Sequence, residues 1–387
     1  MLRITGKYIQ NSVAGETVKA FVPYPLPPSP PVEISNPPIS HFLTKAEKAL
    51  SELKVASRLV PSQDWFAYSF LRMEAVLSSQ IEGTQSTLTD LLEFEASGEK
   101  YPDDPDLQEV CNYLSALEYA KRELKSKSGL PLSLRLLKEM HLRLMKGVRG
   151  QHKMPGEFRS SQNWIGGPRP GLARFVPPPP NEMKKNLTAF EKFLHQKSDV
   201  HPLIKIGLLH AQFETIHPFL DGNGRVGRLL ISLLIEEYGF LDARLLYLSL
   251  YFKRNQSDYY DRLDQIRTKG NWESWIAFFL DGIESICTEA VQIAEKLSDL
   301  FEADRKALLS RKNASITALQ LLELLPEHPI ISSSAIPDLL DTTTPTTTKT
   351  IALLEKAGIL KQIGKAKRNR RLAYHQYLQI LKTFGAE

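Results

Sequence analysis

The chain has 387 residues, of which 42% are hydrophobic and 24% are charged, and its formal net charge is +5. These proportions exclude a largely disordered or collagen-like protein, and the length favours about two or three domains. The two cysteines, Cys111 and Cys287, are too few for a disulfide framework and lack metal-ligand spacing. Since neither an 18-residue apolar run nor an apolar signal core occurs, we expect a cytoplasmic protein that does not enter a membrane.

The first 40 residues predict an arm. Residues 1–22 alternate enough to suggest a short strand, and residues 23–38 contain eight prolines, which favours extended chain of the polyproline type. A free linker is the simpler interpretation of the proline-rich stretch. Its apolar side chains instead favour an arm that lies along the rest of the protein. These side chains are Tyr24, Leu26, Val32 and Ile34.

Helical periodicity dominates the chain from residue 41 to residue 237. Apolar residues recur at i, i+3 and i+4, which predicts an all-α bundle. The expected helices cover residues 41–60, 65–80, 86–96, 106–127, 132–146, 182–195, 201–216 and 225–237. Between the fifth and sixth helices, two β-like runs at 158–165 and 174–177 flank a Gly/Pro turn and predict a small hairpin, here called the flap. The alternative is a structured surface loop packed by Trp164 and Phe175.

Residues 217–228 read His-Pro-Phe-Leu-Asp-Gly-Asn-Gly-Arg-Val-Gly-Arg and combine the groups that a polyphosphate site needs. The Gly-Asn-Gly segment stands at the start of a predicted helix, where backbone N–H groups and the helix dipole attract anions. Arg225 and Arg228 share roughly one helix face and suit phosphate oxygens. Asp221 is a hard oxygen ligand for Mg²⁺, and His217 suits proton transfer near neutrality.

This stretch resembles the signature of the Fic family, His-x-Phe-x-(Asp/Glu)-Gly-Asn-Gly-Arg-x-x-Arg, and matches every fixed position. The resemblance implies transfer of AMP from ATP to a Ser, Thr or Tyr hydroxyl of a target protein and of the protein itself. It implies that His217 takes the hydroxyl proton and that Asp221 holds Mg²⁺ across the α- and β-phosphates. The residues that it implies for ATP binding are Gly222, Asn223, Gly224, Arg225, Val226, Gly227 and Arg228. Among them, 222–224 would hold the α-phosphate, Arg225 the β-phosphate and Arg228 the γ-phosphate.

A second motif, Ser-Ser-Gln-Ile-Glu-Gly at residues 78–83, ends the predicted helix 65–80. It resembles the inhibitory helix of the Fic family, (Ser/Thr)-x-x-x-Glu-(Gly/Asn), with Ser78, Glu82 and Gly83 at its fixed positions. The resemblance implies that Glu82 pairs with Arg228, displaces the γ-phosphate and leaves the α-phosphate out of line for attack. Taken alone, the pattern would be an ordinary helix end with a capping glutamate.

Residues 251–260 lie on a predicted helix that should face the signature. In proteins of the Fic family this helix lines the adenine and ribose, and Asn255 and Tyr259 or Tyr260 are the candidates here. The alternative is that the two tyrosines belong to the core.

The last third of the chain predicts a long helix from 272 to about 311 and a separate C-terminal unit. Helices at 316–325, 334–340 and 346–357 precede a basic hairpin that ends at 372–374, and this order resembles a winged helix-turn-helix domain. Six cations crowd the hairpin without a carboxylate: Lys361, Lys365, Lys367, Arg368, Arg370 and Arg371. Such a basic hairpin, the wing of the domain, can bind the phosphates of a DNA backbone, but it can equally be a solvated tip or a protein-docking surface.

The sequence therefore predicts an all-α protein, a Fic-type helical bundle with a small β-hairpin flap and a C-terminal winged helix-turn-helix domain. The expected divisions are an arm at 1–40, an N-terminal helical region at 41–130 with its inhibitory helix at about 65–83, a Fic core at 131–282, a linker helix at 283–312 and the winged-helix domain at 313–387. The leading hypothesis is a protein adenylyltransferase restrained by Glu82. The alternatives are a DNA-binding regulator with secondary Fic activity and a de-AMPylase. Candidate partners are ATP, a target protein, DNA at the C-terminal unit and a second copy of the chain.

Overall fold

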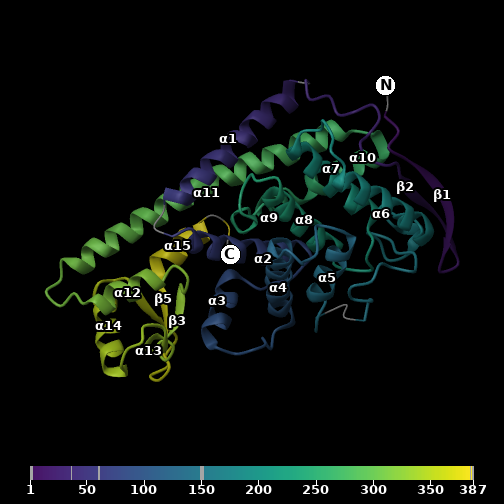
Figure 1. Cartoon of the computed structure of the whole chain (residues 1–387). Coiled ribbons are helices and arrows are strands. Elements are labelled where there is room, and N and C mark those ends of the chain that lie inside the picture. The colour runs from purple at the N-terminus through teal and green to yellow at the C-terminus, as the bar shows by residue number, and fades with distance from the viewer. Residues whose placement is uncertain (1–2, 36, 60–61, 149–151, 384, 386–387) are drawn as a thin grey trace.

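The computed structural model describes residues 3–35, 37–59, 62–148, 152–383 and 385. The described part is mostly helical, which confirms the predicted class (Figure 1). Two long helices, α1 (Pro37–Leu59) and α11 (Trp272–Leu309), run side by side along one edge of the molecule. No helix in these described ranges is both long enough and apolar enough to span a bilayer.

The N-terminal segment is a hairpin followed by a tethered arm. Strands β1 (Gly6–Val13) and β2 (Glu16–Pro23) pair antiparallel, and Ala14 and Gly15 both have positive φ in the turn, as a tight two-residue hairpin requires. The proline-rich stretch is not a free linker, because Arg3 donates to the carbonyls of Pro30 and Pro31 and pairs with Glu273 of α11 at 2.7 Å.

The next four helices match the predicted ones to within three residues. They are α2 (Gln63–Ile81), α3 (Leu88–Ser97), α4 (Pro105–Lys125) and α5 (Leu134–Leu144). Local sequence explains where they begin, since Ser62, Thr87, Asp104 and Ser133 each accept a backbone N–H of the first helical turn.

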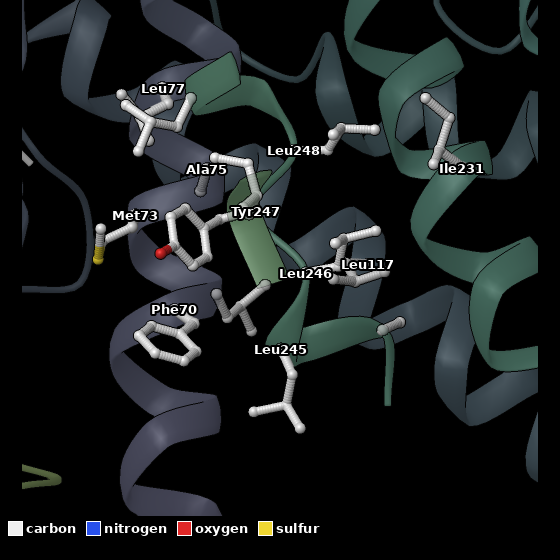
Figure 2. Packing of buried hydrophobic residues seen from close by; sticks show 14 of the residues in the cluster. Phe70, Met73, Ala75, Leu77, Leu117, Ile231, Leu245, Leu246, Tyr247 and Leu248 are labelled. Carbon is white, nitrogen blue, oxygen red and sulfur yellow. The ribbon is translucent and has the colours of Figure 1, made fainter. Parts of the chain in front are cut away.

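Helix α2 lies in the middle of the bundle, with most of its side chains buried. Figure 2 shows Tyr247, from the segment before α9, beside Phe70 and Met73 of α2. The rings of Tyr247 and Phe70 lie 5.1 Å apart, and Tyr247 is fully buried. Packing on several sides therefore fixes α2, and with it the position of its C-cap residue, Glu82.

The flap follows α5 and is small. Ile165 and Phe175 form one antiparallel bridge around the 3₁₀ turn η1 (Pro170–Leu172), so the predicted hairpin is reduced to a single pair in the described residues. The N–H of Phe21 donates to the Val176 carbonyl at 2.9 Å, which links β2 to the flap.

The remaining bundle helices are α6 (Pro180–His195), α7 (Pro202–Ile216), α8 (Asn223–Glu237), the 3₁₀ turn η2 (Ala243–Leu245), α9 (Ser249–Arg254) and α10 (Gln256–Lys269). The helix predicted over 251–260 is interrupted, because Asn255 leaves the helical conformation and separates α9 from α10. Helix α11 shows no break near residue 282, and it runs from the bundle to the C-terminal unit (Figure 1).

The C-terminal unit mixes short helices with a three-stranded sheet. Its elements are α12 (Ile316–Leu324), β3 (Ile330–Ser332), α13 (Ile336–Leu339), α14 (Thr344–Lys356), β4 (Leu360–Ile363), β5 (Arg371–Tyr374) and α15 (His375–Thr383). The sheet order is β3-β5-β4, all antiparallel. Strand β3 and helix α15 were not predicted. Tyr377 of α15 is buried and lies 3.1 Å from the Ser69 hydroxyl, so this unit packs directly on α2.

Candidate active site

The loop between α7 and α8 is held in one shape by its own side chains. His217 ends α7 with φ +49°, and Gly222 precedes α8 with φ +74°, a conformation that glycine adopts without strain. The Asn223 side chain donates to the Phe219 carbonyl at 2.9 Å and accepts the Phe219 N–H at 2.8 Å. Asn223 therefore closes the loop that sets the α8 N-terminus.

This loop opens into a cavity of about 380 Å³, a size typical of small-molecule sites. The cavity brings together the signature loop, the end of α2, the flap and α10. Its lining residues are Glu82, Ile165, Gly166, Arg174, Phe175, Glu214, His217, Gly224, Arg228, Tyr259, Tyr260, Leu263 and Arg267. Of the sequence-predicted residues, His217, Gly224, Arg228, Glu82 and Tyr259 thus meet in one place.

His217 is an uncharged imidazole in this environment. Burial lowers the pKa of His217 to about 4, and the positive charge of Arg159 acts in the same direction. Its backbone carbonyl accepts from the Arg159 guanidinium at 2.9 Å, and its Nδ1 has no partner among the described residues. A neutral ring that lines the cavity can accept a proton.

The Glu82 carboxylate lies on the N-terminus of α8. Its Oε1 accepts from Arg228 Nη2 at 2.7 Å, and a Cβ atom at Gly224 would lie only 2.2 Å from the same oxygen. Arg228 also donates to the Ser78 hydroxyl at 2.8 Å and to the Ser78 carbonyl at 2.9 Å. Burial alone would lower the pKa of Arg228, but the charge and hydrogen bond of Glu82, together with Tyr259 and Glu214, raise it above its ordinary value. A carboxylate therefore neutralises Arg228 beside the N-terminus of α8. Gly83 follows with φ +103°, beyond the end of α2.

Arg225 points away from the cavity. Its Nη1 donates to Glu109 of α4 at 2.6 Å, and both side chains are only 3% exposed. Val226 is fully buried, and Gly227 packs against Glu214 and His210. The structure thus separates Arg225 from the Arg228 site, although both belong to the same signature.

We expect Glu109→Gln to destabilise the fold by about 3–5 kcal/mol, because it leaves the buried Arg225 guanidinium without its counter-charge. Chemical denaturation followed by circular dichroism measures the change. The control is Glu118→Gln on the exposed face of the same helix, which should stay within about 0.5 kcal/mol of the wild type. Equal unfolding midpoints for the two variants would contradict a stabilising Arg225–Glu109 pair.

Asp221 is the candidate metal ligand, and its environment fits Mg²⁺ beside a polyphosphate. Its carboxylate accepts from the Gly222 N–H at 2.7 Å and from Lys153 at 2.9 Å. Burial would raise the pKa of Asp221, but the hydrogen bond and charge of Lys153, the Gly222 N–H and the Arg225 charge together lower it, so the group is ionised. In the described ranges no three His, Cys, Asp or Glu residues cluster as a ready metal site. One carboxylate completed by phosphates and water is a usual Mg²⁺ arrangement.

His141 was missed by sequence reasoning, although it supports this loop. Its Nδ1 accepts the Gly156 N–H at 2.9 Å, its Nε2 lies 3.1 Å from the Asp221 carbonyl, and its ring stacks on Phe219 at 3.8 Å. A lone histidine on an amphipathic helix carries no signal for such a role.

Helix α10 supplies the side of the cavity opposite α8. The Tyr259 hydroxyl lies 2.8 Å from His210 Nε2, and the side chain is 1% exposed. Asn255 does not line the cavity, because its side chain donates to the Tyr251 carbonyl. Tyr260, Leu263 and Arg267 do line it. Leu263 and Arg267 follow Tyr260 by three and seven residues, and this helical spacing was the signal in the sequence that could have indicated them.

Two family models match the chain. Residues 41–122 match the Fic/DOC family N-terminal model, and residues 131–235 match the Fic/DOC family model. The protein adenylyltransferase Fic of Aedes aegypti is 30% identical over 183 residues, which cover 47% of this chain and 32% of the relative. The relative of the same name from Drosophila persimilis is 27% identical over 237 residues, covering 59% and 41%. The chain thus spans about a third of the length of the first of these relatives.

Solved structures show the same fold. A Fic family protein from Desulfovibrio desulfuricans G20 superimposes with a TM-score of 0.57 at 20% identity and covers 87% of this chain and 96% of its own. Fic-1 from C. elegans gives a TM-score of 0.52 at 20% identity, covering 68% and 76%. With both family models placed around the cavity that holds His217, Gly224 and Arg228, residues 41–122 and 131–235 of the chain carry the N-terminal and core domains of the Fic/DOC family.

Proposed function

We propose that this protein is an adenylyltransferase that moves AMP from ATP to a Ser, Thr or Tyr hydroxyl of a target protein and of itself. The observation that carries the proposal is the single cavity onto which a neutral His217 and the Gly224–Arg228 anion site both open. The names of the curated relatives support the same activity.

In the proposed reaction, the target hydroxyl oxygen attacks the α-phosphorus of ATP and its proton passes to the His217 imidazole. The bond from the α-phosphorus to the bridging oxygen breaks, and pyrophosphate leaves with the electron pair. The α8 N-terminus and Arg228 would hold the phosphates, so positioning and charge neutralisation provide most of the catalysis. Asp221 would hold Mg²⁺, which neutralises phosphate charge when bound.

The same proposal includes restraint by Glu82. Since its carboxylate already pairs with Arg228, the terminal phosphate of ATP must compete with an internal anion. The de-AMPylase alternative needs Glu82 to orient a water molecule instead, and the direct Glu82–Arg228 pair favours restraint.

For the C-terminal unit we infer a winged-helix domain at residues 313–387, joined to a core at 131–282 through 283–312. Its support is the succession of three helices and an antiparallel β4–β5 hairpin. The DNA-binding alternative is weaker, because Arg370 pairs with Glu355 and Arg371 pairs with Glu93, so two of the six wing cations already have a carboxylate partner. The cytoplasmic location and a homodimer stay predictions from the sequence.

The test is label transfer. Purified wild-type and Glu82→Gly proteins are incubated with α-labelled ATP, Mg²⁺ and cell lysate. We expect labelled protein bands with Glu82→Gly, including its own, and identification of the bands names the target. In a parallel reaction of the purified Glu82→Gly protein without lysate, and so without the protein kinases that lysate contains, ATP labelled at the γ-phosphate should leave no label on the protein, because that phosphate departs in pyrophosphate. Label from the γ-position, or none from the α-position, would refute AMP transfer.

A further inference from the structure

Three buried polar atoms of the cavity lack a hydrogen-bond partner among the described residues. They are Glu214 Oε1, His217 Nδ1 and Arg267 Nε. A buried polar atom without a partner is costly, so such atoms in a cavity wall point to a ligand that completes them. The proposed reaction uses the His217 ring, but it assigns nothing to Glu214.

Glu214 stands on α7, three residues before His217, and its carboxyl group packs against α8. A Cβ atom at Gly227 would lie 2.4 Å from Glu214 Oε1, so the glycine at 227 makes room for this carboxyl group. Arg228 is close, yet its guanidinium donates to Ser78 and Glu82. Burial raises the pKa of Glu214 to about 7, against the opposing effect of the Arg228 charge.

A structural carboxyl group in the same protein looks different. Glu74 on α2 is equally enclosed, but it accepts from the Tyr113 hydroxyl at 3.0 Å and from the Ser249 N–H and hydroxyl at 3.0 and 2.5 Å. The protein therefore satisfies Glu74 completely from within. At Glu214 it leaves an oxygen unsatisfied beside a cavity.

The cavity lining combines two kinds of surface. Gly224 and Arg228 supply an anion site, while Ile165 and Phe175 of the flap and Leu263 of α10 supply apolar surface, which suits a flat base. Arg267 stacks 4.0 Å over the Phe175 ring. Glu214 lines the same cavity, and the charges of Arg228 and Arg267 both act to lower its pKa.

We propose that Glu214 is a nucleotide-binding residue that accepts a hydrogen bond from a ribose hydroxyl. In a nucleotide, the ribose joins the base to the phosphates, so a nucleotide bound in this cavity would present its ribose between the apolar surface and the anion site. Phosphate oxygens only accept hydrogen bonds and would be repelled by a carboxylate, whereas ribose hydroxyls donate, and acidic residues hold them in dinucleotide-binding folds. The inference rests on the proposed function, because it requires a nucleotide in this cavity.

The experiment compares nucleotides that lack one ribose hydroxyl. Calorimetry measures the binding of ATP, 2′-deoxy-ATP and 3′-deoxy-ATP to full-length Glu82→Gly protein with and without Glu214→Ala. We expect the Glu82→Gly parent to bind one deoxy analogue roughly tenfold more weakly than ATP. Glu214→Ala should weaken ATP binding by a similar factor and bind ATP and that analogue equally. Glu214→Gln, which keeps an acceptor oxygen, should retain part of the discrimination.

Two controls, and the binding of ATP by the parent, distinguish failure of the Glu214 inference from failure of the proposed function. Glu118→Gln removes one charge outside the cavity and should leave all three affinities unchanged. In the absence of nucleotide, the Glu214→Gln protein should have a melting temperature no lower than that of its parent, since the oxygen that it loses had no partner. A lower melting temperature would mean that the carboxyl group is structural and would overturn the inference. The inference would also be overturned, while AMP transfer stands, if Glu214→Ala still distinguished ATP from the deoxy analogue or if the Glu82→Gly parent did not distinguish them. A parent that binds no nucleotide would overturn the proposed function as well.

Discussion

Glu82→Gly should increase auto-modification by about tenfold or more at matched ATP and Mg²⁺. The substitution removes the carboxylate that accepts from Arg228 at 2.7 Å and lies against Gly224. Arg228 is 2% exposed, so this charge-assisted hydrogen bond is screened far less than a surface ion pair. Its loss frees the guanidinium for the terminal phosphate. Incorporation of label from α-labelled ATP measures the change.

Arg228→Ala provides the control for this activation. It also breaks the pair, but it removes the phosphate clamp, so it should not activate. Glu82→Gly/Arg228→Ala should therefore stay nearly inactive, and Glu82→Gln should fall between the wild type and Glu82→Gly. Equal auto-modification by the wild type and Glu82→Gly would reduce residues 78–83 to an ordinary helix end.

His217→Ala should lower AMP transfer by about 10²–10⁴-fold in the Glu82→Gly background, the usual contribution of a general base. ATP affinity should change little, because the imidazole acts on the incoming hydroxyl. Single-turnover transfer and calorimetry measure the two quantities. The matched control is His195→Ala, an exposed histidine at the end of α6, which should transfer at the parent rate. Transfer by His217→Ala at the parent rate would refute the mechanism.

The low pKa of His217 also predicts the shape of the pH profile. An ordinary histidine would lose its basic form as the pH falls through about 6.5. Because burial lowers the pKa of His217 to about 4, the ring stays neutral from pH 8 to pH 6. Transfer by Glu82→Gly/Glu214→Gln, which lacks the carboxyl group with a pKa of about 7 in the same cavity, should therefore show no decline centred near pH 6.5. A midpoint there would mean that the ring is exposed to water when it reacts.

The helices of the bundle could be predicted because their signals are local. Periodic apolar residues and capping side chains such as Ser62 and Thr87 fix where helices form and begin. Strand β3, which was missed, lacks such a signal: it has three residues and exists through pairing with β5, which lies some forty positions later in the chain. A strand of that kind depends on a distant partner that periodicity does not identify.

The signature likewise identified the centre of the cavity but not every side-chain direction. Arg225 and Arg228 lie three residues apart, yet Arg225 turns to Glu109, whose position depends on how α4 packs. Asn255 was expected at the nucleotide, but it stands where α9 ends and α10 begins. Glu214 could not be found in advance, because one acidic residue in the mostly apolar helix α7 carries no pattern, whereas the helical spacing from Tyr260 could have indicated Arg267.

The burial of α2 has a kinetic consequence for the proposed restraint. The helix is held by the bundle on one side and by Tyr377 on another, while the Glu82 carboxylate at its end is 32% exposed. Under the proposed function, release then requires rotation of one glutamate side chain, and exposed side chains change rotamer within nanoseconds. Such an equilibrium relaxes far faster than a turnover of typical length. The restraint is then a competition whose outcome follows ATP concentration, so inhibited and competent molecules interconvert many times during each catalytic cycle.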